Sequence, residues 1–551
     1  MNPDHRAGLE EDIGRQIDIL MKKPRLIVIV PGLEAKIQKW DRLIARLKQE
    51  SELAEETCVW LIYDPKAKGL GRQRAKDMVR NLVAHIDEEW VRNNGFEKIL
   101  LVGHSLGGLV VRGAYVTGRG ANPDQPQAHD WAPKVSRIVL LAAPNRGVEK
   151  LPFGLARVSD WLLRQMPSLA FTYQDLMRGS NFVTSLRINW IRLFAAKNGE
   201  TATLPDVVQL LGVHDTIVHR DDSVDVLSFS TAIAGEIPDA DHKSLPDLDS
   251  ASDPDGRYLM LKTAILDPKN LPVHGQQANV PTKPTFSHVV FVLHGIRASN
   301  IANWLREVAK EVMRVYPPDT DVRRPPYGYF TALSFVLPRV RRRNIRIFQD
   351  AYTEALAASP NAIFDFIGHS NGTYMLGESL RDVSGMSFRN VVVAGAVLPS
   401  DYPWAGKLGV QVDRVRSERG QKDWPVGWLC SALNGGLGMT DVGTGGYTGF
   451  VRGQVEEEQY SPGGHGGMFN EENIPRMVRW INNQDPGPEL PSQVPELAWW
   501  SVVSRMCPHL LHGALVLFFL GVGYLVWAHS FLGLLIVAGV LYIVYFILSV
   551  L

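Results

Sequence analysis

Cysteine is the scarcest residue type in this sequence: Cys58, Cys430 and Cys507 are the only three among 551 residues. Cysteines so few and so far apart exclude a disulfide framework and a cysteine-rich metal cluster, and they favour a reducing compartment. Net charge is absent as well, because 58 Lys and Arg residues balance 58 Asp and Glu residues. Nothing in this balance therefore suggests a chain built to coat nucleic acid or an anionic membrane, and no nucleic acid is expected as a partner.

Charged side chains are missing altogether from the C-terminal part, since no Asp, Glu, Lys or Arg occurs in residues 506–551. That stretch exceeds the roughly 20 residues that one membrane-spanning helix needs. We therefore predict a transmembrane helical hairpin over 506–551 that turns at residues 528–530; a buried helix pair is the alternative. Arg505 flanks the first span, and neither the turn nor the end carries a basic residue. The soluble domains are therefore expected to face the cytoplasm.

Two proline-rich stretches divide the rest of the chain. Residues 267–284 and 483–505 lack apolar periodicity and are predicted to be linkers. Length favours the same division, because single cores stop growing at roughly 250 to 300 residues. The predicted domains are 1–266 and 285–482.

Both predicted domains contain the same order of patterns. Each opens with a continuous apolar run that ends in glycine, RLIVIVPG from Arg25 and HVVFVLHG from His288. Such runs are typical of parallel strands that are buried on both faces. A helical pattern, a serine motif, a second helix and another apolar run follow in each domain. This alternation predicts the α/β class, with a doubly wound parallel sheet built twice.

The serine motifs are GHSLG at 103–107 and GHSNG at 368–372. Between a strand and a helix, GxSxG predicts a turn so tight that its flanking positions require glycine, and the turn exposes the serine at the carboxyl edge of the sheet. Ser105 and Ser370 are therefore candidate nucleophiles. The candidate oxyanion donors are the backbone amides after the two serines and those after the first strand of each domain, namely Leu106, Asn371, Leu33 and Ile296.

A serine nucleophile needs a histidine to accept its proton and a carboxylate to orient that histidine. In the first domain, GVHDTIV supplies Asp215 after a late strand, and DHKSL supplies His242 in a later loop. The order is then Ser, Asp, His. Histidines beside the acid in sequence cannot easily approach it from a separate loop, and the other acids are interpreted as solvated loop residues. These weaker candidates are His214, His219, Asp206 and Asp221.

In the second domain, the run VQVDRVRSERGQKDWPV supplies Asp423, and SPGGHGGMF supplies His465. The glycines on both sides of His465 suit a loop that must approach the serine closely, although they also suit an ordinary flexible surface loop. Glu418 remains an alternative for the acid.

At these residues both halves resemble the α/β-hydrolase superfamily. Pro31-Gly32, GHSLGG, LLAAPNRG, GVHDTIV and DHKSL make residues 25–250 resemble lipase-like serine esterases, the group that includes the GPI inositol deacylases. The family commonly has histidine before the glycine of the oxyanion loop; here Pro31 stands there, whereas the second domain has His294. The resemblance implies ester hydrolysis through an acyl-enzyme, with no metal and no organic cofactor.

The two copies differ in spacing, because 110 residues separate Ser105 from Asp215 and only 53 separate Ser370 from Asp423. The first domain therefore has room for a cap insertion, at about 144–200, of the kind that covers a lipid-sized acyl pocket; an ordinary packing helix is the alternative. In the second domain, the basic run PRVRRRNIRIF from Pro338 suits either contact with lipid head groups or a solvated helix face.

We therefore predict a membrane-anchored tandem serine hydrolase that cleaves carboxylic esters, with lipid esters as the expected substrates. Acyl transfer uses the same three residues and remains an alternative. A third possibility, from another class, is that one or both domains are scaffolds that bind a lipid or a partner.

Overall fold

The computed structural model describes residues 25–32, 37–65, 73–149, 167–195, 204–219, 222, 232–271, 285–295, 303–328, 335–451, 455, 457–461, 463–487, 498–527, 538–539 and 542. The chain divides into two compact units, Met1–Lys283 and Pro284–Leu551. Much of each predicted linker lies outside the described residues, namely 272–284 and 488–497.

The first unit contains a parallel six-stranded sheet with the strand order β2-β1-β3-β4-β5-β6. The strands are β1 (Arg25–Val30), β2 (Cys58–Ile62), β3 (Ile99–His104), β4 (Val135–Leu141), β5 (Asp206–Gly212) and β6 (Ala232–Ile237). The apolar run of β1 pairs with β3, and β3 pairs with β4. The serine motif that follows β3 therefore emerges near the middle of the carboxyl edge of the sheet.

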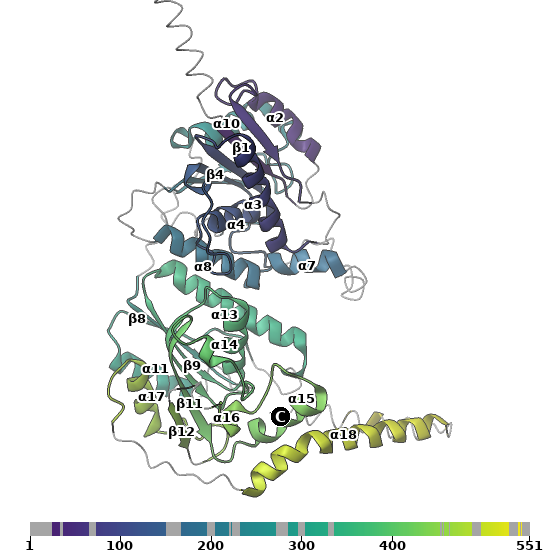
Figure 1. The fold of residues 1–551 in the computed structure, drawn as a ribbon, viewed down its shortest axis with the longest axis vertical. Coiled ribbons are helices and arrows are strands. Elements are labelled where there is room, and N and C mark those ends of the chain that lie inside the picture. Colours follow the sequence, from purple (N-terminus) through teal and green to yellow (C-terminus); the bar gives the residue numbers. More distant parts are fainter. Residues whose placement is uncertain are drawn as a thin grey trace, which may run out of the picture. The chain divides into compact units, whose positions relative to one another are not determined.

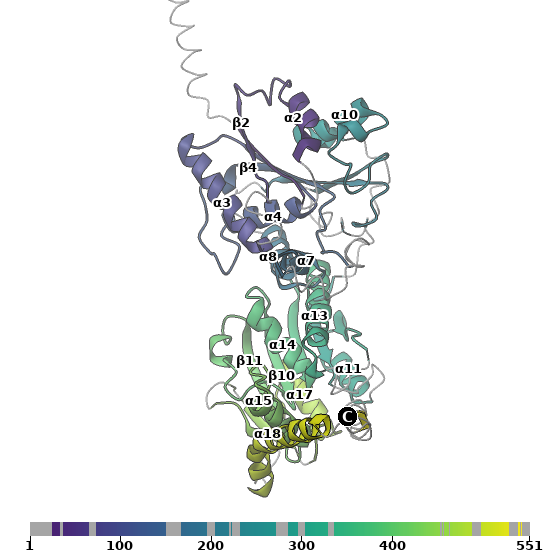
Figure 2. The ribbon, with the colours of Figure 1, turned by 90° about the vertical axis from the view of Figure 1, so that its right-hand side faces the viewer.

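Helices cover both faces of this sheet. They are η1 (Ile37–Trp40), α2 (Asp41–Leu47), α3 (Ala75–Arg92), α4 (Leu106–Gly118), η2 (Ala132–Lys134), α7 (Pro167–Leu176), α8 (Asn181–Ala195), η4 (Leu248–Ser250), α10 (Pro254–Leu266) and η5 (Pro268–Asn270). In Figures 1 and 2, α2 and α10 lie on one side of the sheet, and α3 and α4 lie on the other. The first unit is thus a three-layer α/β domain.

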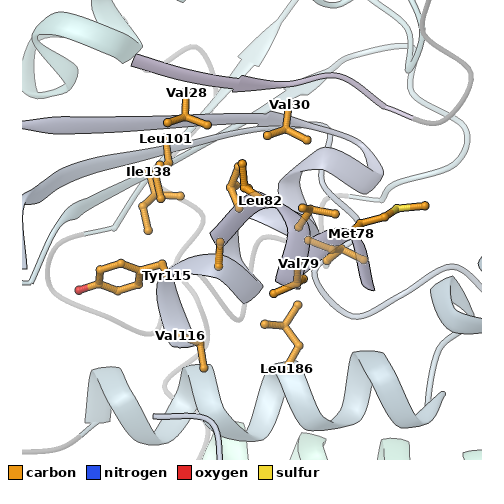
Figure 3. Close-up of a cluster of buried hydrophobic side chains, with 14 of the residues drawn as sticks. Val28, Val30, Met78, Val79, Leu82, Leu101, Tyr115, Val116, Ile138 and Leu186 are labelled. Atoms are coloured by element: carbon orange, nitrogen blue, oxygen red, sulfur yellow. The ribbon is translucent and has the colours of Figure 1, made fainter. Parts of the chain in front are cut away.

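The larger core of the first unit lies between the sheet, α3, α4 and α8. Strand residues point towards residues of the three helices, as Figure 3 shows for Val28, Val30, Leu101, Ile138, Met78, Val79, Leu82, Tyr115, Val116 and Leu186. Every residue of α4 is buried, because this helix lies in the middle of the layer. The start of α4, next to Ser105, is therefore held by packing along the whole helix.

The second unit repeats the architecture with the parallel strand order β12-β11-β10-β9-β7-β8. Read from the other edge, this order matches that of the first sheet, so β9 takes the place of β3. The strands are β7 (His288–Leu293), β8 (Thr320–Arg323), β9 (Ile363–His369), β10 (Phe388–Ala394), β11 (Val412–Gly420) and β12 (Glu457–Ser461). Two parallel-sheet α/β domains, as predicted, are thus present.

The helices of the second unit are α11 (Asn303–Val315), α13 (Pro338–Ala358), α14 (Asn371–Asp382), η6 (Trp404–Gly406), the π-helical η7 (Pro425–Cys430), α15 (Ser431–Leu437), α16 (Gly445–Thr448), α17 (Asn473–Ile481) and α18 (Ala498–Trp527). One face of the sheet packs against α11 and α17. On α13, the rings of Phe348 and Tyr352 contact the sheet residues Phe291 and Phe388.

The C-terminal helix α18 begins at Ala498, within the stretch predicted as a linker, and its segment Trp499–Tyr524 is long and apolar enough to cross a membrane. Its first turns pack against η7 and α15. The buried Ser504 donates a hydrogen bond to the carbonyl of Gly427 and accepts one at its own carbonyl from Ser431 Oγ, at 2.7 Å. One apolar helix is therefore described; the turn and most of the second half of the predicted hairpin lie outside the described residues.

Candidate active sites

Ser105 lies between β3 and α4 in a strained backbone conformation, with φ 52° and ψ −122°. A non-glycine residue rarely adopts positive φ, and such strain persists where the surroundings enforce it. The flanking glycines allow the turn: a Cβ on Gly107 would lie 1.9 Å from Val30 O, and one on Gly103 would lie 2.5 Å from Gly107 O. The sequence motif therefore forms the predicted strand-turn-helix.

Ser105, His242 and Asp215 form a hydrogen-bonded chain. Ser105 Oγ lies 2.8 Å from His242 Nε2, and His242 Nδ1 lies 3.0 Å from Asp215 Oδ2. Because the carboxylate can only accept, Nδ1 carries the proton and Nε2 is free to accept from the serine hydroxyl. The three side chains come from the ends of β3, β5 and β6, which lie at one edge of the sheet.

The electrostatics keep Asp215 ionised. Burial raises the pKa of Asp215, but hydrogen bonds from His242 and from the amides of Ile217 and Val218 outweigh burial and bring the pKa below its usual value. These amides lie 2.8 and 2.9 Å from Asp215 Oδ1. The carboxylate of Asp215 can therefore stabilise a positive charge on His242, and the two amides fix the orientation of that carboxylate.

His104 is a further residue of the first site, which the sequence interpretation missed. Its Nε2 donates a 2.7 Å hydrogen bond to the backbone carbonyl of His242. The ring is 2% exposed, and burial, followed by the nearby His242, lowers the pKa of His104 to about 3. His104 is therefore neutral near pH 7, and it ties the loop of His242 to the end of β3. The only signal in the sequence was the histidine shared by both serine motifs.

The second site has the same backbone turn and the same buried histidine. Ser370 has φ 52° and ψ −117°, and His369 Nε2 donates a 2.7 Å hydrogen bond to the carbonyl of His465. His465 Nδ1 lies 2.8 Å from Asp423 Oδ2, and Asp423 Oδ1 accepts a 3.0 Å hydrogen bond from the amide of Val426. Asp423 and His465 thus form a hydrogen-bonded pair of the same kind as Asp215 and His242.

The two sites differ at the serine. Ser105 is partly exposed, whereas Ser370 is 2% exposed. Among the described residues, no hydrogen bond joins Ser370 Oγ to His465. A Cβ on Gly295 would lie 2.6 Å from Ser370 Cβ and 3.1 Å from Ser370 Oγ, so the loop after β7 lies against this serine. In the described conformation, the second serine is covered and is not bonded to its histidine.

The structure separates the weaker candidates from these groups. Asp206 lies at the start of β5, where it pairs with Arg137, at the opposite edge of the sheet from Ser105. Glu418 is buried and accepts hydrogen bonds from Arg416, at 2.7 Å, and Asn473, at 2.9 Å. Asp423, rather than Glu418, is the carboxylate that contacts His465. Both competing histidines, His214 and His219, are exposed, and Asp221 lies outside the described residues.

Two of the predicted oxyanion donors are described. The amides of Leu106 and Asn371 open α4 and α14, where amides have no partner within the helix. Leu33 and Ile296 lie outside the described residues. The glycine just before Leu33 is described, and a Cβ on Gly32 would lie 2.9 Å from Ser105 Cβ, so glycine is required for this loop to approach the serine.

The predicted cap at 144–200 is described only in part, since residues 150–166 and 196–200 lie outside the described residues. Its last helix, α8, packs on the core beside α4 through Val183, Leu186 and Trp190, so this part is a packing helix. Within the described ranges, no group of three His, Cys, Asp or Glu side chains is arranged to hold a metal ion.

Residues 21–136, which include β1 and the Ser105 motif, match a family described as "Putative serine esterase (DUF676)". The match and the two parallel-sheet domains confirm the predicted resemblance to the α/β-hydrolase superfamily. The family match also confirms the prediction of a serine ester hydrolase. Comparison with curated protein sequences found no match.

Comparison with solved structures matches parts of this chain to proteins from several bacteria. Phospholipase PlaB from Legionella pneumophila, in complex with thio-NAD, is 18% identical with a TM-score of 0.25, over 34% of this chain and 38% of that one. A lipase-esterase related protein from Clostridium acetobutylicum is 14% identical with a TM-score of 0.28, and the match covers 44% of this chain and 96% of that one. Est1E from Butyrivibrio proteoclasticus is 16% identical with a TM-score of 0.27, over 44% and 86%.

Proposed function

We propose that the chain is a membrane-anchored hydrolase that cleaves carboxylic esters of lipids through an acyl-enzyme on Ser105. The observation that carries this proposal is the hydrogen-bonded chain of the first site, with 2.8 Å from Ser105 Oγ to His242 Nε2 and 3.0 Å from His242 Nδ1 to Asp215 Oδ2. A serine in this chain can lose its proton to the histidine as it attacks a carbonyl carbon.

The reaction then has two halves. In the first, Ser105 Oγ forms a bond to the ester carbonyl carbon while its proton moves to His242 Nε2, and Asp215 stabilises the resulting imidazolium. The amide of Leu106 donates to the oxyanion, and the positive end of α4 favours this charge. When the C–O bond of the ester breaks, the alcohol leaves with the proton from Nε2.

In the second half, a water molecule gives a proton to His242 Nε2 and attacks the acyl carbon. The bond to Ser105 Oγ then breaks, the serine takes the proton back, and the carboxylic acid leaves. The amide of Leu33 is the proposed second oxyanion donor. The close approach of Gly32 to Ser105 supports that assignment, because Leu33 is the next residue.

Membrane anchoring and a lipid substrate are supported by α18. Its side chains beyond His512 include the exposed Leu517, Phe519 and Leu520, which water solvates poorly. We propose that α18 and the residues after it form the predicted hairpin in a membrane, with both domains on the cytoplasmic side. An esterase held there would meet lipid esters at the bilayer surface.

For the second domain we propose the site Ser370, His465 and Asp423, with the amides of Asn371 and Ile296 as oxyanion donors. Turnover there would require Ser370 to rotate towards His465 and to become exposed. A binding role for this domain is the second candidate, and the 2% exposure of Ser370 favours it.

A fluorophosphonate probe tests the proposal, because it labels only a serine that a base activates. The purified full chain in mild detergent should be labelled on the peptide that contains Ser105, and His242→Ala should abolish that label. Labelling of Ser370 alone, in a protein that hydrolyses esters, would assign the activity to the second domain. Hydrolysis that persists without any labelled serine would refute the proposed mechanism.

A further inference from the structure

Helix α13 carries an unusual row of basic side chains at its start. Arg342 and Arg343 are exposed, and Arg346 is half-buried one turn further on. With the exposed Arg339, they occupy positions i, i+3, i+4 and i+7, which share one face of a helix. The opposite face, with Asn344, Ile345 and Phe348, is buried in the domain. We call the four residues 339, 342, 343 and 346 the arginine stripe.

The position of the stripe is electrostatically unfavourable within the folded domain. The stripe occupies the first turns of α13, where the helix dipole is positive and acidic residues are preferred, yet the first turn contains none. Burial and then the charge of Arg342 lower the pKa of Arg346, which indicates repulsion along the stripe. Within the described part of the chain, Arg342, Arg343 and Arg346 form no ion pair.

The start of α13 is connected to the apolar helix by a short chain of contacts. Arg341, on the buried side of α13, contacts Met439 Sδ at 3.9 Å. The amide of Met439 donates a 3.1 Å hydrogen bond to Leu433 O in α15. Helix α15 in turn packs on α18 so closely that a Cβ on Gly435 would lie 2.7 Å from Pro508. The start of α13 and the candidate membrane helix thus belong to one contiguous part of the second unit.

We propose that the arginine stripe binds the phosphate groups of anionic lipids at the surface of the membrane that α18 enters. This inference rests on the proposed membrane anchoring. Guanidinium groups suit phosphate because they donate paired hydrogen bonds in a plane, and the positive end of α13 adds to the attraction. The contact would orient the second domain on the bilayer and would not be needed for ester cleavage at Ser105.

Arginine modification measures this contact directly. The full chain is reconstituted in nanodiscs of phosphatidylcholine alone or with about one third phosphatidylglycerol, and phenylglyoxal modification of each arginine is followed by mass spectrometry. One basic residue near an anionic surface gains roughly fivefold in binding. We therefore expect Arg342 and Arg343 to react severalfold more slowly in the anionic discs, and salt at about 1 M should remove most of the difference.

Arg306 is the internal control, because it is exposed on α11, which packs on the other face of the sheet. Its rate should be the same in both discs. The double variant Arg342→Gln/Arg343→Gln should keep wild-type esterase activity but should remove the protection of Arg346 against phenylglyoxal in the anionic discs. The control variant Arg306→Gln should keep both the activity and the protection of Arg346.

Two results would overturn the inference while leaving the anchor intact, and a third would overturn the anchoring on which the inference rests. Equal rates for the stripe in both discs would remove the lipid contact while leaving the anchor intact. Equal protection by millimolar inorganic phosphate in detergent would make the stripe a site for a soluble anion instead. A chain that does not enter nanodiscs of either composition would refute the anchoring itself.

Discussion

Replacing His104 tests how the first site holds the histidine that we propose as the base. The variant His104→Ala removes the donor of the 2.7 Å hydrogen bond to the carbonyl of His242. Since His104 is 2% exposed, water reaches this carbonyl poorly, and the carbonyl is left without a partner unless the loop moves. Any such movement carries the ring of His242 away from Ser105.

The size of the effect follows from that carbonyl. A buried carbonyl without a hydrogen bond costs about 1 to 3 kcal/mol, which corresponds to roughly 5- to 150-fold in a rate if the loop transmits all of it to the reacting groups. Displacing a reacting group by about 1 Å has a similar cost, on the order of 100-fold. We therefore expect kcat on a medium-chain ester to fall by about 10- to 100-fold, with KM little changed.

The duplicated architecture supplies the control. His369 makes the same 2.7 Å hydrogen bond, to the carbonyl of His465, so His369→Ala loses the same ring and the same bond in the other domain. Initial rates of ester hydrolysis and denaturant unfolding are measured for both variants. Each should destabilise its own domain, but only His104→Ala should slow turnover. If His104→Ala were as destabilised as His369→Ala yet kept the wild-type kcat, the bond would have no role in positioning His242.

Three further predictions concern the nucleophiles, the anchor and acid. Ser105→Ala should lower ester turnover by roughly 10³-fold or more, whereas Ser370→Ala should leave most of it; the reverse result in purified variants would transfer the activity to the second domain. A chain that ends at residue 497 should keep the activity of Ser105. Its second domain should unfold at a lower denaturant concentration than that of a chain that ends at 512, because only the longer chain keeps the hydrogen bonds of Ser504 with η7 and α15. Equal midpoints of unfolding would contradict the packing of α18. The third prediction concerns unfolding curves at pH 7 and pH 5. The folded pKa of His104, about 3, lies below the unfolded value of 6.5, so the unfolded state takes up a proton first as the pH falls. The contribution of His104 to the free energy of unfolding is therefore complete above pH 6.5 and falls by about 1.4 kcal/mol per pH unit below it. His104→Gln should therefore show about 2 kcal/mol less of this acid loss in the first domain, and identical pH dependence of the two proteins would argue against a buried neutral histidine.

The strands and both serine turns could be predicted because their physical requirements are local. A strand buried on both faces needs a continuous apolar run, and the tight turn after it needs glycine at fixed positions, as the 1.9 Å contact of a Cβ at Gly107 illustrates. Asp215 and His242 could be named because the ends of parallel strands meet at one edge. Their proximity in space therefore follows from topology once the strands are assigned.

Other features could not be predicted because they depend on packing between distant segments. The bond between His104 and the loop of His242 joins residues 138 positions apart and requires the depth of the ring, which no pattern records. The covering of Ser370 is likewise a property of the folded loops. The sequence left Glu418 as an alternative acid, and only the folded structure shows that its contacts with Arg416 and Asn473 occupy both of its oxygens.

The packing of α18 links the second domain to the proposed membrane. Asp423 O accepts a 2.9 Å hydrogen bond from the amide of Gly427, and the carbonyl of Gly427 accepts one from Ser504 on α18. Only one residue, Gly427, thus links the candidate acid of the second site to the candidate membrane helix. A shift of α18 along its axis would be transmitted to η7, since Ser504 is buried and Ser431 bonds to it as well. Helix α18 belongs to the second unit, so we expect such a shift to act on Asp423 and His465.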